Sequence, residues 1–122
     1  MDILVNNARR QRSVPSILDL TTEEFDATFE TNVYAMFWIT KASIPHLQAG
    51  ASITNTGSEQ AYDPSADLSA YASIKAVIIN FTEALSKQLG EKDIRVNAVA
   101  ARPVRTPLQI SGGHQQDDLA NF

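Results

Sequence analysis

Apolar residues follow two different periods along this chain. Short apolar or alternating runs at residues 3–5, 52–56 and 94–100 predict β-strands. The segments from 21 to about 45 and from about 70 to 89 instead carry apolar residues at helical spacing. The resulting order, β-α-β-α-β, predicts an α/β fold with three parallel strands and right-handed crossovers through two long helices.

The helix boundaries carry signals of their own. Thr21 and Glu24 match a capping box at the start of the first helix, and Pro45 suggests its end. Gly90 is placed as the C′ residue that ends the second helix. An apolar stripe at intervals of four residues should face the core from the first helix: Phe25, Phe29, Val33 and Phe37.

The first predicted strand begins almost at the N-terminus. Ile3, Leu4 and Val5 are all apolar, as in a parallel strand that is covered on both faces. Few domains begin in the middle of a sheet, so we expect an upstream half to be missing. The prediction is a single partial domain over residues 1–122, with about 108–122 poorly ordered.

Candidate chemistry gathers where the predicted strands end. Asn7, Ser58 and Val104 each come just after a strand, and Tyr71 lies in the first turn of the helix that follows Ser58. In open α/β sheets, ligands bind outside the carboxyl ends of the strands. We therefore expect these residues to lie near one site.

Tyr71 and Lys75 are four residues apart, which places them on one helix face. A neighbouring ammonium lowers the pKa of a phenol and suits it to acid–base catalysis. A hydroxyl such as Ser58 would hold the reacting oxygen. Taken alone, however, the pair is more often an ordinary contact on a helix surface.

Composition and charge narrow the functional classes. A net charge of −4 and a pI near 5.0 argue against nucleic-acid or anionic-membrane surfaces. The basic segment 9–12 is interpreted as a solvated loop. The sequence has no Cys, and His46 and His114 lack a ligand-like spacing, so no metal site is expected. Without an apolar span or a signal segment, the chain is expected to be cytoplasmic.

Several motifs together resemble the short-chain dehydrogenase/reductase family. Ser58 precedes Tyr71 by thirteen residues, and Tyr71 and Lys75 form a YxxxK motif. The other matching stretches, spread over almost the whole chain, are residues 2–8, 31–33, 95–99 and 103–107. Residues 55–62 and 106–113 are most similar to the glucose/ribitol-dehydrogenase-like branch. The resemblance implies a partial Rossmann-like, doubly wound, NAD(P)-binding domain.

The resemblance also implies a catalytic set. Tyr71 would be the acid–base residue, Lys75 would lower its pKa and hold the nicotinamide ribose, and Ser58 would orient the substrate oxygen. Asn32 would anchor a water molecule that links Lys75 to solvent. For Asn32, a polar residue with no special role inside a helix remains the alternative.

A second group of residues would bind the cofactor, NAD or NADP. By the same resemblance, Asn7 and Ala8 would border the cofactor ribose, and Val104 and Thr106 would line the nicotinamide end. A simple loop hydroxyl before Pro107 is the alternative for Thr106.

Three departures from the family pattern stand out. The glycine-rich loop that receives the pyrophosphate is absent from this sequence. Arg9 stands where a small residue follows Asn-Asn-Ala, and Ala101-Arg102 replaces Pro-Gly. Arg9 and Arg102 could crowd the cofactor, bind an anion, or reach an acidic side chain such as Glu59. Random drift at positions released from cofactor binding is the favoured alternative.

Two functions remain open from the sequence. The first is an oxidoreductase that acts on a small alcohol or carbonyl substrate, with very weak or no turnover in the isolated chain because remote binding energy is lost. The second is a non-catalytic remnant that forms homo-oligomers through its two long helices.

Overall fold

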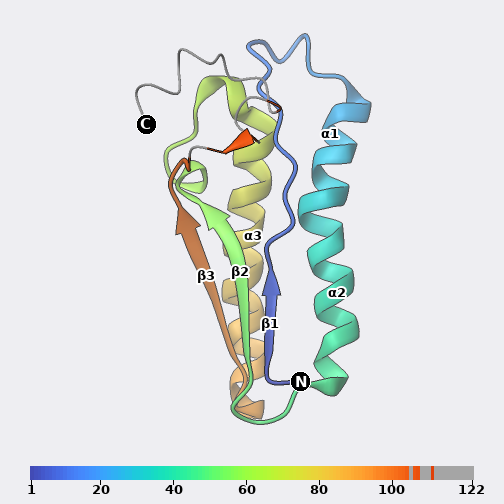
Figure 1. Ribbon diagram of the computed structural model, residues 1–122, viewed down its shortest axis with the longest axis vertical. Helices are drawn as coiled ribbons and strands as arrows, with labels where there is room; N and C mark the ends of the chain where they lie inside the picture. Colours follow the sequence, from blue (N-terminus) through green and yellow to red (C-terminus); the bar gives the residue numbers. More distant parts are fainter. Residues whose placement is uncertain (105, 108–110, 112–122) are drawn as a thin grey trace.

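Three parallel strands alternate with long helices in the computed structural model, which describes residues 1–104, 106–107 and 111 (Figure 1). The strands are β1 (Ile3–Asn6), β2 (Ser52–Ser58) and β3 (Arg95–Ala101), and the main helices are α1 (Thr22–Phe29), α2 (Ala35–Ser43) and α3 (Ser69–Leu89). The segment expected to be poorly ordered, about 108–122, lies outside the described residues except for Ser111.

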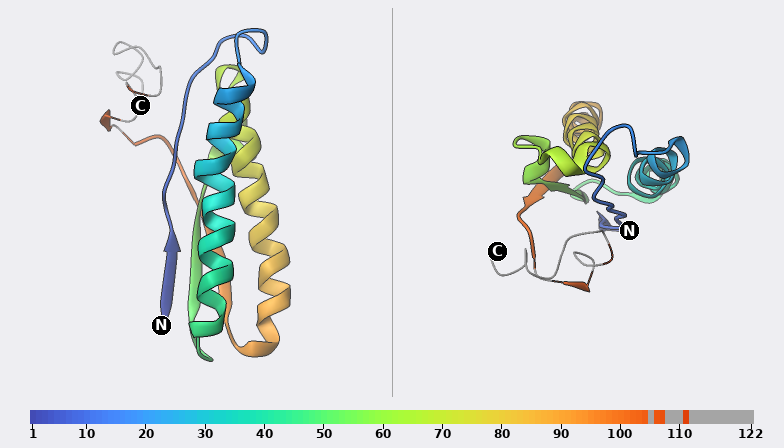
Figure 2. Two further views of the ribbon diagram at one scale, coloured as in Figure 1. Left: turned by 90° about the vertical axis from the view of Figure 1, so that its right-hand side faces the viewer. Right: turned by 90° about the horizontal axis from the view of Figure 1, so that it is seen from above.

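The sheet has the order β1-β2-β3, with both strand pairs parallel. Ile53 in the central strand is in register with Leu4 on one side and Val96 on the other. All three helices lie against the same face of the sheet (Figure 2). The predicted α/β architecture of three parallel strands and two long helical segments is confirmed.

The core lies between this sheet face and the helices, in two clusters. One packs the amino-terminal ends of β2 and β3 against the end of α3; its buried members are Ala51, Ile53, Leu85, Leu89, Ile94 and Val96. The other joins the first half of α3 to α2, with buried members Met36, Leu68, Tyr71, Ile74 and Ile78. Tyr71 is therefore part of the second cluster as well as a candidate site residue.

The opposite sheet face is open in the described part of the chain. Ile3, Val5 and Val99 point to this side and expose 65%, 59% and 55% of their surfaces. The expectation that β1 is covered on both faces is therefore wrong, because α1, α2 and α3 all cross on the same side. The fully apolar sequence of β1 nevertheless provides a surface that a second layer would cover.

The first long helical segment is not a uniform α-helix. Thr21 caps its start, with Oγ1 accepting a hydrogen bond from the backbone N–H of Glu24 at 3.2 Å, as predicted. A π-helical segment, Glu30–Tyr34, joins α1 to α2 and shifts the side-chain phase. The predicted stripe is consequently split: its middle residues pack on the core, whereas Phe25 and Phe37 remain 39% and 40% exposed.

The end of α3 also differs from expectation. Gly90 is the C-cap residue, but its φ of −56° is right-handed and the chain continues into a 3-10 turn, Gly90–Lys92. Asp93 adopts the left-handed conformation instead, with φ 56°. The prediction that Gly90 is the C′ residue is wrong, since Asp tolerates the left-handed region and ends the turn three residues later.

Four polar side chains join the sheet to the helices through the buried layer. Asn55 is fully buried; its Nδ2 donates to Thr82 Oγ1 at 2.9 Å and its Oδ1 accepts from Asn6 Nδ2 at 2.8 Å. Asn6 Nδ2 also donates to Thr40 Oγ1 at 3.0 Å. This network connects β1 and β2 to α2 and α3 and fixes their relative positions.

Candidate functional site

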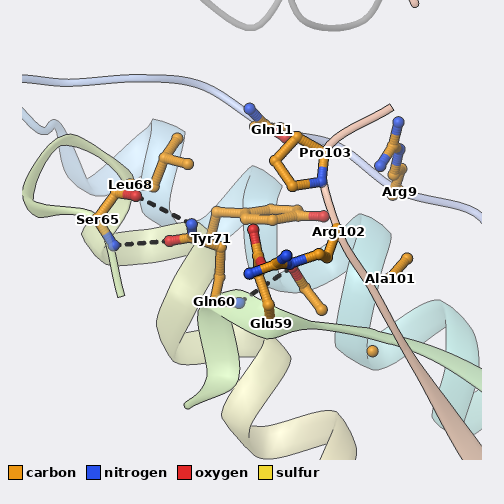
Figure 3. A pocket seen from close by; sticks show the side chains of 12 residues that line it. Arg9, Gln11, Glu59, Gln60, Ser65, Leu68, Tyr71, Ala101, Arg102 and Pro103 are labelled. Atoms are coloured by element: carbon orange, nitrogen blue, oxygen red, sulfur yellow. Dashed lines mark hydrogen bonds and ion pairs between the residues drawn. The ribbon is translucent and has the colours of Figure 1, made fainter. Parts of the chain in front are cut away.

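A cavity of about 170 Å³ opens at the carboxyl end of the sheet and contains two of the predicted site residues, Ser58 and Tyr71. Figure 3 shows Arg102 and Glu59 beside the Tyr71 ring, while Arg9 approaches from the segment that follows β1. The remaining lining residues are Gln11, Gly57, Gln60, Ser65, Leu68, Ala101 and Pro103. The cavity therefore combines hydroxyl groups with both arginines that depart from the family pattern.

Ser58 is held by the turn that it begins. It is the last residue of β2, and its Oγ accepts a hydrogen bond from the backbone N–H of Gln60 at 3.2 Å. That bond caps the short 3-10 turn Glu59–Ala61. That bond does not use the hydroxyl hydrogen, so Ser58 can donate it to Tyr71 or to a ligand oxygen in the cavity.

Tyr71 lies in the first turn of α3 and exposes only 4% of its surface. Burial raises the pKa of its phenol, and the charge of Arg9 together with hydrogen bonding from Arg9 and Ser58 opposes that increase. The expectation that Lys75 sets a lowered pKa of Tyr71 is wrong: burial dominates, and the guanidinium of Arg9 is the cation that acts on the phenol.

Lys75 lies behind the tyrosine rather than at its hydroxyl. Its ammonium is 5.3 Å from the centre of the Tyr71 ring and donates to the backbone carbonyl of Thr56 at 2.7 Å. The side chain is 1% exposed. Burial, followed by the repulsion of Arg9, lowers the pKa of Lys75 to about 8. No sequence pattern identifies a backbone carbonyl as the partner, so the role of Thr56 was missed.

Asn32 occupies the π-helical segment and is 2% exposed. Its side-chain amide pairs with the backbone of Arg10 in both directions: Oδ1 accepts from the N–H at 3.2 Å and Nδ2 donates to the carbonyl at 3.0 Å. Nδ2 also donates to Thr28 O at 2.7 Å. Asn32 therefore anchors the segment after β1. The alternative interpretation, a polar residue with no special role inside the helix, does not account for these hydrogen bonds.

The predicted cofactor residues divide between two places. Asn7 and Ala8 line a neighbouring cavity of about 110 Å³ that Asn32 also lines, and Asn7 Oδ1 accepts from Thr56 Oγ1 at 2.8 Å. Val104 is 57% exposed. The hydroxyl oxygen of Thr106 is buried and, among the described residues, has no hydrogen-bond partner. An unsatisfied buried hydroxyl can accept or donate a hydrogen bond to a ligand.

The arginines that follow β1 differ in what they contact. Arg10 and Arg12 both pair with Glu24, at 3.1 Å and 2.6 Å, while their side chains stay 44% and 57% exposed, so the basic segment is a loop with solvated arginines that is also fastened to α1. Arg102 reaches Glu59 with an Nε–Oε2 distance of 2.8 Å, which is the acidic partner suggested by the sequence. Arg9 has no carboxylate partner among the described residues.

A family model described as short chain dehydrogenase matches residues 1–117. The chain belongs to the short-chain dehydrogenase family. The oxidoreductase YghA of Escherichia coli (strain K12) is 51% identical over 122 residues, which are the whole of this chain and 42% of that protein. The glucose and ribitol dehydrogenase of Daucus carota is 38% identical over 122 residues, again 42% of its length.

Solved structures agree with this family assignment. A short chain dehydrogenase from Burkholderia cenocepacia J2315 in complex with NADP is 42% identical and superposes with a TM-score of 0.78, covering 82% of this chain and 41% of that one. The chain thus spans about 42% of the length of the short-chain dehydrogenase relatives that it matches. That proportion agrees with the prediction of a partial domain.

No helix in the described ranges has the length and apolar character needed to cross a bilayer.

Proposed function

We propose that this chain carries the proton-transfer half of an oxidoreductase site, in which hydride passes between NAD or NADP and an alcohol or carbonyl substrate. The observation that supports this most is the shared cavity of Ser58 and Tyr71, with the ammonium of Lys75 buried behind the ring. Two hydroxyls on one small cavity can both reach a single reacting oxygen.

The proposed steps assign one task to each side chain. Ser58 donates a hydrogen bond to the substrate oxygen and orients it. Tyr71 gives its proton to that oxygen during reduction and takes it back during oxidation. The positive charge of Arg9 stabilises the tyrosinate that forms, and burial strengthens this effect. When bound, the cofactor supplies or accepts the hydride at the substrate carbon.

The residues present fit only the nicotinamide end of such a cofactor. Lys75 and Tyr71 would hold the ribose, and the buried hydroxyl of Thr106, which has no partner within the described ranges, would bind near the nicotinamide together with Val104. Asn7 and Ala8 would border the ribose, and Asn32 would position the water that serves Lys75. Because the sequence contains no glycine-rich pyrophosphate loop, we expect weak cofactor affinity for these 122 residues.

Tyr71→Phe tests the proposal directly. Oxidation of NADH and NADPH is followed by absorbance against a panel of small aldehydes, ketones and oxo acids. The loss of one acid–base group should lower turnover by about 10²–10⁴-fold. Tyr62→Phe is the matched control, because Tyr62 is 69% exposed and lies outside the cavity. If Tyr71→Phe turns over substrate as fast as the wild type, Tyr71 is not the acid–base residue.

An exposed aromatic surface favours a second candidate, helix-mediated association. Tyr34 and Trp38 stack at 5.9 Å between ring centres while remaining 51% and 54% exposed, and Phe37 and Ile39 of α2 are also 40% and 48% exposed. Apolar patches of this kind often mark protein interfaces. Size-exclusion chromatography of the wild type and of Trp38→Glu tests this candidate, together with titration of NADH and NADPH. A dimer that is lost in Trp38→Glu, without saturable cofactor binding, would favour a non-catalytic association module over the enzyme.

A further inference from the structure

Arg9 differs from the other charged residues around the Tyr71 cavity. Its side chain is partly buried, lines the cavity, and has no carboxylate partner among the described residues. Arg102 is already paired with Glu59 at 2.8 Å. Because Glu59 is the one carboxylate among the described residues that line this cavity, the described part of the wall carries one more guanidinium than carboxylate.

The segment that carries Arg9 is fixed on both sides of the cavity. Asn32 binds both backbone groups of the next residue, Arg10, and Glu24 holds the Arg10 side chain. Farther along, Val14 N–H donates to the carbonyl of Asp67 at 2.7 Å, and Ser13 Oγ donates to the carboxylate of the same residue at 2.5 Å. Asn32 and Glu24 lie in the first helical segment and Asp67 lies just before α3, so the backbone that carries Arg9 is held in place. A fixed backbone reduces the entropy that is lost when the side chain binds an anion.

The position of this guanidinium relative to the phenol limits what it can bind. Arg9 and Tyr71 line the same cavity, and the charge of Arg9 opposes the rise that burial causes in the pKa of the phenol. A guanidinium has five N–H donors in a planar fork, so donors remain for a carboxylate. Because Arg9, Ser58 and Tyr71 line one small cavity, a compact ligand can place a carboxylate on Arg9 and a second oxygen on the two hydroxyls. A 2-oxo acid carries a carboxylate and an oxygen on adjacent carbons.

From this arrangement we infer that Arg9 forms a carboxylate subsite, and that the substrates of this site are small 2-oxo acids and the corresponding 2-hydroxy acids. Ser58 and Tyr71 hold the reacting oxygen, and Arg9 holds the carboxylate beside it. The cavity of about 170 Å³ suits a compound of a few heavy atoms. This assignment rests on the proposed dehydrogenase function for its chemistry, but the carboxylate binding itself needs no cofactor.

The test is binding without cofactor. Pyruvate, its neutral amide pyruvamide, and inorganic phosphate are each titrated against the chain, with thermal stability and calorimetry as readouts. Pyruvate should bind more tightly than pyruvamide or phosphate. Arg9→Gln should weaken pyruvate binding by about ten- to a hundredfold, because a charge-assisted hydrogen-bond pair is lost. Arg9→Lys should recover part of that loss, since the charge remains without the fork.

Arg95→Gln is the matched control. It removes the same charge at the start of β3, at the opposite end of the sheet, from an exposed side chain. Equal affinity for pyruvate in wild type and Arg9→Gln would overturn the subsite, as would equal binding of pyruvate and pyruvamide, or a preference for phosphate. Circular dichroism of each variant shows whether the fold is retained.

Tyr71→Phe separates this inference from the proposed function. If the variant binds pyruvate but no longer reduces it, both ideas stand. If wild type binds pyruvate through Arg9 and yet never oxidises NADH or NADPH with it, the carboxylate subsite stands and the dehydrogenase proposal fails for this chain.

Discussion

The ammonium of Lys75 donates a hydrogen bond to the backbone carbonyl of Thr56, with Nζ and O 2.7 Å apart. This bond joins the second turn of α3 to the central strand β2, through a side chain that is 1% exposed. A carbonyl carries only a partial negative charge, so it does not fully compensate a buried ammonium. The positive charge is thus kept at the site at a cost to stability.

That cost predicts a pH dependence. The pKa of Lys75 falls from 10.5 in the unfolded chain to about 8 in the folded one. Between these values the unfolded chain binds one more proton, so the free energy of unfolding rises as the pH increases through this window. The gain should reach at most about 3 kcal/mol across the full interval. Urea unfolding from pH 7 to 10 measures it.

Lys75→Met should flatten this dependence, because it removes the titrating group. Lys87→Met provides the control, since Lys87 lies exposed on the same helix. Measurements stop near pH 10 because the raised pKa of Tyr71 acts in the opposite direction above that point: the unfolded phenol then releases its proton first. A slope that is the same in wild type and Lys75→Met would contradict the assignment.

The buried network around Asn55 makes a second prediction. Asn55→Ala would leave Asn6 Nδ2 and Thr82 Oγ1 each without one partner in a layer that excludes water. We expect a loss of about 2–4 kcal/mol in the free energy of unfolding, since two buried polar groups lose a hydrogen bond and a cavity forms. Asn97→Ala, at an exposed position on β3, should change stability by less than about 0.5 kcal/mol. Similar losses in the two variants would show that the network contributes little.

The sequence was sufficient to predict the helices, the strands and their order, because these depend on local patterns of residues. Apolar periodicity identified three strands and two long helical segments, and the YxxxK spacing placed Tyr71 and Lys75 on one face of α3. Ser58 and Tyr71 could be brought together because parallel strands end at one edge of a sheet.

What the sequence could not predict depends on contacts between distant segments. The cation that acts on the Tyr71 phenol is Arg9, some sixty positions earlier, and Lys75 instead meets a backbone carbonyl that has no sequence signal. The open face of β1 was missed because a strand sequence of apolar residues is the same whether or not a second layer of helices covers that face of the sheet. The π-helical turn at Asn32 was missed because the inserted residue leaves the apolar pattern nearly unchanged.

Asn32 should control the segment that carries Arg9. Asn32→Ala would free the backbone N–H and carbonyl of Arg10 and the carbonyl of Thr28. We expect a loss of about 1–3 kcal/mol in the free energy of unfolding and much faster hydrogen exchange at the Arg10 amide. Thr31→Ala, at the preceding position in the same helical segment, should leave that amide protected. Unchanged exchange in Asn32→Ala would show that the ion pairs with Glu24 suffice to hold the segment.

Gly57 tests how tightly β2 packs beside Ser58. A Cβ at this position would come within 2.8 Å of Ile79 Cδ1 and 3.4 Å of Val99 O, so Gly57→Ala requires Ile79 to move. We expect a loss of about 1–3 kcal/mol in the free energy of unfolding from overpacking. In an Ile79→Val background the loss should nearly disappear, because Cδ1 is gone and the next atom, Cγ1, is at an ordinary 3.7 Å.

Gly90→Ala is the opposite case and serves as the control. Nothing lies within 4 Å of its added Cβ, and its φ of −56° suits alanine, so this substitution should raise stability by about 0.4–1 kcal/mol. A double-mutant cycle on Gly57 and Ile79 should give a coupling of about 1 kcal/mol or more. Additive effects would mean that the clash is relieved by a shift of β2 itself, which would carry Ser58 with it and lower turnover as well as stability.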